Sequence, residues 1–151
     1  AHVRQGQTSA PLQLFDYWAS RTNPQGLINV RNFHPRDTLP EDVCRWISWL
    51  DVDIDSADNF VWHDHIYDLQ KGGESASFCN ASNLRIREHQ NRLHARACSY
   101  EYVRCKSLKQ PLYHEIEQTI GGTYRHYSRL LLPVADDDGE ITRIVFACRR
   151  H

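Results

Sequence analysis

The sequence predicts a small α+β domain in which helices pack on one face of an antiparallel sheet. Three observations lead to this fold class. Apolar and acidic residues alternate strictly over residues 50–55, as in a strand with one solvated face. Two groups of strands flank a long helical segment, and there is no regular alternation of strand and helix, so a parallel sheet is disfavoured. A length of 151 residues fits one domain.

The first ten residues of the chain are largely polar and without periodicity, so we expect them to form a flexible N-terminus, with the single domain spanning residues 11–151. Ser9, Ala10 and Pro11 have the composition of a helix start, since serine caps helices and proline favours their first turn. Apolar residues follow at helical spacing. A helix is therefore expected from Pro11 to about Arg21, and the turn formers of 22–26 end it.

A hairpin is predicted in the next segment. After two prolines, residues 41–46 carry two acids at the start of one helical turn. The alternating strand 50–55 comes next, and residues 59–67 are rich in β-branched and aromatic side chains. The polar turn 56–59 between them makes an antiparallel pair the natural arrangement.

The central helix is expected to start from caps among residues 80–82 and to end near Leu108, because Pro111 prevents its continuation. A flexible connection over residues 71–75 precedes it. Its apolar stripe, which we expect to face the sheet, recurs at a period close to 3.6 residues. The stripe consists of Leu93, Ala97, Tyr100 and Val103 or Arg104.

Three strands are predicted at the C-terminal end of the chain. Residues 112–119 form the first, and the Gly121-Gly122 turn follows. Residues 124–133 and 140–148 form a strong hairpin across the turn sequence Asp136-Asp137-Asp138-Gly139. The two predicted strand groups together give five strands.

Composition excludes several classes of protein. The formal net charge of −1 gives no overall attraction to nucleic acid or to an anionic membrane. Residues 37–68 are acidic and 84–109 are basic, which we interpret as solvated faces that partly neutralise each other, with a basic groove for an acidic partner as the alternative. Five cysteines without a CxxC pair, no secretory leader and no long apolar run indicate reduced thiols and a cytoplasmic location without membrane insertion.

Particular stretches resemble the PAS family of sensory and regulatory domains. The similarity is to a bacterial subgroup that opens with a tryptophan-containing helix and ends with an aromatic-Arg-Leu-Leu-Leu-Pro strand. The stretches that carry it are 14–18 (LFDYW), 50–52 (LDV), and 127–134 (YSRLLLPV) ahead of the turn 137–139. It covers roughly residues 12–148, but residues 64–82 depart from the pattern.

The resemblance implies a five-stranded antiparallel sheet with helices over one face and an extra N-terminal helix. It implies a sensor or interaction module in bacterial signalling that acts on a small ligand or a protein partner and often forms homodimers. The subgroup has no catalytic motif, so no enzyme activity is expected. Because fold does not determine function, these remain expectations by analogy.

Aromatic and imidazole side chains are dense in the segments expected between helix and sheet. A ligand pocket there is one interpretation and a plain core is the other. The residues are Trp62, Tyr100, Tyr113, His114, Tyr124, His126 and Tyr127. The pattern does not decide which face of the strand 124–132 meets the helices, and it does not identify a cofactor.

Metal and thiol chemistry receive weaker support. His63 and His65 share one face of a strand, but two ligands do not make a site, and a third would have to come from elsewhere, for example His114 or His126. No metal site is therefore predicted. Cys98 and Cys105 lie seven residues apart on one helix face, where core packing is expected. A redox-sensing thiol would need basic neighbours, which Arg96, Arg104 and Lys106 can supply.

Three functions follow in order of support. The first is a regulatory PAS-like domain without catalysis. The second is a small cone-shaped α+β enzyme or ligand carrier, which His63 and Asp64 disfavour because they alternate faces. The third is nucleic-acid binding by a basic helix face, which the near-neutral charge opposes.

Overall fold

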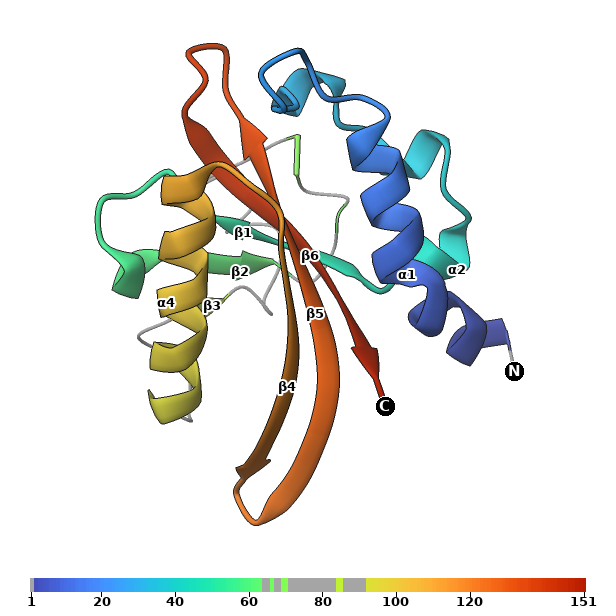
Figure 1. The fold of residues 1–151 in the computed structure, drawn as a ribbon, viewed down its shortest axis with the longest axis vertical. Helices are drawn as coiled ribbons and strands as arrows, with labels where there is room; N and C mark the ends of the chain where they lie inside the picture. Colours follow the sequence, from blue (N-terminus) through green and yellow to red (C-terminus); the bar gives the residue numbers. More distant parts are fainter. Residues whose placement is uncertain (1, 64–65, 67–68, 71–83, 86–91) are drawn as a thin grey trace.

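The computed structural model describes residues 2–63, 66, 69–70, 84–85 and 92–151. One antiparallel sheet with the strand order β3-β2-β1-β6-β5-β4 organises the molecule (Figure 1). Its strands are β1 (Ile47–Asp51), β2 (Val61–His63), the two-residue β3 (Leu84–Arg85), β4 (Leu112–Ile120), β5 (Thr123–Ala135) and β6 (Ile141–Arg150). The α+β class and an antiparallel sheet of five principal strands are confirmed, with β3 as a short addition at the edge.

Both predicted hairpins form with antiparallel register. β1 pairs with β2 so that Trp49 lies opposite His63. β4 and β5 meet at the Gly121-Gly122 turn, where φ values of 57° and 80° fall in the left-handed region that glycine adopts without a steric penalty. β5 and β6 pair across the Asp136–Gly139 turn, in which the Asp136 carboxylate accepts backbone N–H bonds from Asp138 and Glu140.

The first strand ends earlier than predicted. β1 spans Ile47–Asp51, whereas the alternation of residues 50–55 predicted a strand to Asp55 with one wet face. Asp51 is buried, and its Oδ1 accepts the backbone N–H of Asp53 at 3.0 Å. This local bond turns the chain out of the sheet, which is the common way in which aspartate ends a strand.

The N-terminal helix begins nine residues before the predicted start. α1 spans His2–Ala19 with Pro11 inside it, so the prediction of an irregular segment before Pro11 was wrong. Ser9 does not cap the helix; its hydroxyl bonds back to the Gly6 carbonyl and accepts from the Gln13 amide. At Gly6 a Cβ would lie 2.3 Å from the Asp42 carbonyl oxygen, so glycine allows α1 to approach the short helix α2 (Glu41–Cys44).

The central helix α4 spans Arg92–Leu108 and ends where predicted, with Lys109 at a φ of 55° after it. The face that it presents to the sheet was predicted wrongly. The stripe of Leu93, Ala97, Tyr100, Val103 and Arg104 points to solvent. The buried positions are Ala95, Cys98, Tyr102 and Cys105. The predicted caps at 80–82 and the connection 71–75 lie outside the described residues.

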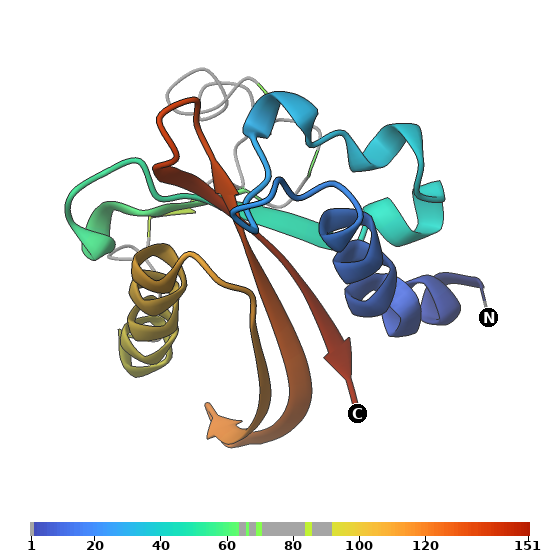
Figure 2. The ribbon, with the colours of Figure 1, turned by 45° about the horizontal axis from the view of Figure 1, so that its top comes forward.

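Helices cover both faces of the sheet. Figures 1 and 2 show α1 and α4 on opposite sides of β5 and β6. Leu130 and Leu132 pack with α1 in one apolar cluster, while Leu131 packs with α4 in a second. The helices were expected on one face; the additional N-terminal helix instead covers the other, and the sheet lies between two cores.

Two of the three stretches that carried the family resemblance contact each other directly. The indole Nε1 of Trp18 in α1 donates a hydrogen bond of 3.0 Å to the backbone carbonyl of Pro133 in β5, and both groups are buried. Pro133 sits at an interior strand position, where proline removes a backbone donor but leaves its carbonyl to accept. The tryptophan thus fixes α1 against the sheet.

Candidate functional site

The seven side chains predicted to line one cavity do not converge in the described part of the molecule. Cross-strand partners share a face of a sheet, so the pairing of β4 with β5 assigns each side chain to one core. Trp62, His114 and Tyr127 lie on the α4 side, Tyr113, Tyr124 and His126 lie on the α1 side, and Tyr100 is on the outer surface of α4 with 69% exposure.

The α4 side is centred on a residue that the sequence did not single out. Tyr102 is buried, and its hydroxyl accepts a 3.1 Å hydrogen bond from Trp62 Nε1, with the two rings edge to face at 6.2 Å. Burial raises the pKa of Tyr102, so the hydroxyl stays protonated in the physiological range. Trp62 therefore belongs to the packing beneath α4.

Arg129 is buried in the same layer. One Nη donates to the Cys98 thiol at 3.0 Å, and the guanidinium carbon lies 5.5 Å from the centre of the Tyr102 ring. Its Nε has no hydrogen-bond partner, and it forms no ion pair with the carboxylates of the described residues. The sequence signal for this arginine was its place in the stretch 127–134 (YSRLLLPV) that carries the family resemblance.

Two further predicted residues make polar contacts at the edge of this layer. His114 Nε2 lies 2.9 Å from Glu101 Oε2 and joins β4 to α4. The Tyr127 hydroxyl accepts from the Gln118 amide at 3.2 Å, and partial burial raises the pKa of Tyr127. The first contact joins α4 to the hairpin, and the second joins β4 to β5 within it.

The prediction that Cys98 and Cys105 are core residues is confirmed. Burial raises the pKa of Cys105 to about 12, which keeps the thiol protonated near neutral pH. Lys106 does not supply a basic neighbour, because its Nζ donates to the Val52 carbonyl. Cys98 instead contacts Arg129, on the facing strand.

Of the two histidines considered as a metal-binding pair, the structure describes only His63. His63 is fully buried on the α1 side, and its ring stacks on Trp49 with centroids 3.9 Å apart at 11°. His65 lies outside the described residues. His63 is thus part of the core.

A groove opens on the α1 side between α1 and the β4–β5–β6 sheet. It has a volume of about 580 Å³, within the range of small-molecule sites. The lining residues are Thr8, Pro11, Leu12, Phe15, Pro111, Leu112, Tyr113, Leu130 and Arg149. Of the seven predicted residues, Tyr113 lines this groove.

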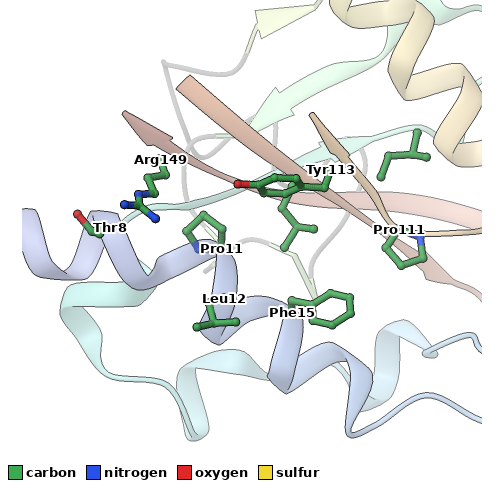
Figure 3. Close-up of a pocket in the computed structure, with 9 residues that line it drawn as sticks. Thr8, Pro11, Leu12, Phe15, Pro111, Tyr113 and Arg149 are labelled. Carbon is green, nitrogen blue, oxygen red and sulfur yellow. The ribbon is translucent and has the colours of Figure 1, made fainter. Parts of the chain in front are cut away.

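The groove has an apolar body and one charged end. Leu12 and Tyr113 are more than 60% exposed, so both are accessible to a ligand in the groove. Figure 3 shows Arg149 and Thr8 toward one end, with Phe15 and Pro111 toward the other. Arg149 makes no ion pair with the described carboxylates.

The groove therefore combines an apolar lining with one guanidinium group at its end. Comparison with known proteins adds little to this. No protein-family model and no curated protein matches the chain. Among the described residues, none forms a helix long and apolar enough to cross a bilayer.

Two solved structures show partial similarity. The PAS domain of BvgS from Bordetella pertussis is 18% identical with a TM-score of 0.46, over 70% of this chain and 75% of that one. A fungal LOV-domain photoreceptor is 20% identical with a TM-score of 0.45, over 93% of this chain and 90% of that one.

Proposed function

We propose that the chain is a PAS-like sensory or regulatory domain in bacterial signalling, without catalytic activity, that binds a small amphipathic anion in the groove between α1 and the sheet. The groove carries this proposal. An apolar lining binds a hydrocarbon body, and Arg149 at one end binds an anionic head group. Trp18 also supports a signalling role, because its hydrogen bond joins α1 to β5. A ligand that binds between α1 and the sheet would act on this contact.

A defined probe tests the groove. Decanoate, which has an anionic head, and decanol, which has none, are titrated against the protein by calorimetry. The variant Arg149→Gln should weaken decanoate binding by about fivefold, the effect of one exposed ion pair, and leave decanol binding unchanged. Arg150→Gln is the matched control because Arg150 lies next in β6 and is paired with Tyr127, on the opposite face.

A charged variant tests the apolar body of the groove. Leu12→Glu places a charge among the lining side chains at a position that is 66% exposed, so the fold should persist. Both probes should then bind at least about tenfold more weakly, since burial of one leucine side chain against a ligand is lost. Failure of both probes to bind the parent protein, or equal binding by Leu12→Glu, would refute the groove as the ligand site.

The outer face of α4 supports a second candidate function, which is self-association or contact with a protein partner. Leu93 and Tyr100 are 82% and 69% exposed, and Val103 and Leu108 in the last two turns of α4 are 42% and 46% exposed. Contiguous exposed apolar side chains commonly mark protein contacts. We expect sedimentation to show a homodimer, and Tyr100→Glu should raise its dissociation constant at least about tenfold, as loss of a central aromatic contact does.

Gln25→Glu is the control for this experiment, because it adds the same charge to an exposed polar position in the turn after α1, outside α4. A monomer at all concentrations, or a dimer that tolerates Tyr100→Glu, would contradict self-association through this face.

A further inference from the structure

Four side chains of the types that bind metals lie together on the α1 face of the sheet. They lie in the half of the β4–β5 hairpin that is nearer its turn. Glu115 and Glu117 alternate along β4, and Glu117 lies directly opposite His126 of β5. The backbone N–H of His151 donates to the His126 carbonyl at 3.0 Å, which extends the β6 ladder by one residue. Three adjacent strands therefore bring these side chains to one place.

The ligating atoms are already close together. His126 Nε2 lies 2.5 Å from Glu115 Oε1 and 3.8 Å from Glu117 Oε1. The His126 and His151 rings stack with centroids 4.5 Å apart. One ligand atom from each of Glu115, His126 and His151 lies within 4.8 Å of the other two.

We propose that Glu115, His126 and His151 bind a divalent cation of the zinc class, with Glu117 or water completing the coordination. Imidazole nitrogen and carboxylate oxygen are the ligands that such cations take, at about 2.0–2.2 Å, so ligand atoms in a tetrahedral site lie about 3.3 Å apart. The present spacings of the three atoms, from 2.5 Å to at most 4.8 Å, bracket that distance. This inference does not depend on the groove or its ligand.

The surroundings suit a bound cation. The side chains of Glu115 and Glu117 are about 60% exposed, so metal and a water ligand have access, while His126 is half-buried. Ser128 Oγ lies 2.5 Å from His151 Nε2 and orients that ring, as groups around metal ligands commonly do. A bound metal would clamp the C-terminal end of β6 to the hairpin.

His114 provides a matched internal control. It lies next to Glu115 on β4 but points to the other face, where its ion-pair partner among the described residues is Glu101. The pair of His114 and Glu101 contains the same residue types without the third ligand. Any binding that is general to histidine and glutamate would therefore be affected equally at both places.

The test uses tag-free protein that has been stripped with a chelator and titrated with zinc chloride by calorimetry. We expect one zinc per chain, and a rise in Tm of roughly 5–10 °C at about a hundred times the dissociation constant, since binding stabilises only the folded state. His126→Gln, His151→Gln and Glu115→Gln should each weaken binding at least about a hundredfold. His114→Gln should bind as the parent does, and circular dichroism reports whether each variant is folded.

The proposal is overturned if the parent protein gives neither a binding heat nor a rise in Tm. It is also overturned if the folded variants at 115, 126 and 151 bind zinc as tightly as His114→Gln, because the ligands would then lie elsewhere in the chain.

Discussion

Replacement of Trp49 by alanine should lower the free energy of unfolding by about 3–5 kcal/mol, as loss of a fully buried tryptophan does. Trp49 lies on β1, between β2 and β6, and has no exposed surface. Its ring stacks on His63, and the Arg143 guanidinium lies 5.4 Å from it. The variant therefore creates a cavity at the centre of the α1 core and leaves His63 without its stacking partner.

Urea denaturation followed by far-ultraviolet circular dichroism measures this loss without relying on tryptophan emission. Trp46→Ala is the matched control, because Trp46 is only half-buried and packs at the edge of the same core. It should cost clearly less than Trp49→Ala. A loss below about 1 kcal/mol for Trp49→Ala would contradict the position of this ring in the core.

The C-terminal hairpins could be predicted well from the sequence because local chemistry specifies them. Gly121 and Gly122 favour the left-handed turn, and Asp136 bonds the backbone of its own turn. The strands on either side of these turns, β4, β5 and β6, are nine to thirteen residues long and pair with one another. Such contacts lie close in sequence, so neighbouring residues suffice to predict them.

The orientation of α4 could not be predicted because apolar periodicity was a poor guide to its buried face. Arg129 of the sheet faces this helix. The buried face of α4 contacts it through the Cys98 thiol, which accepts a hydrogen bond, and through the Tyr102 ring. Leu93 and Tyr100 were assigned to the core on hydrophobicity alone, and both are exposed. The chemistry of the opposing strand, distant in sequence, decided which face is buried.

The candidate sites share this dependence on distant segments. The groove combines residues of α1 with Arg149, which are separated by most of the chain, and the histidine cluster requires His151 to lie beside His126. Tyr113 and His126 were noted as ligand-pocket candidates from their residue type. Their partners became evident only when the strand register was known.

The presence of a core on each face of the sheet can be tested by the loss of stability at two adjacent residues of β5. Leu131 and Leu132 both have no exposed surface, yet Leu131 packs beneath α4 and Leu132 beneath α1. Successive side chains of a strand point to opposite faces, so a sheet covered on one side would bury only one of them. Leu131→Ala and Leu132→Ala should each lower the free energy of unfolding by about 2–5 kcal/mol.

Leu12→Ala serves as the control for these two variants, since truncation of a side chain that is mostly exposed should change stability by no more than about 0.5 kcal/mol. Chemical denaturation of all three proteins gives the comparison. If Leu132→Ala behaved like Leu12→Ala while Leu131→Ala remained costly, α1 would not be packed on the sheet in solution. The groove would then lose one of its walls, so this pair of variants also tests the structural basis of the proposed ligand site.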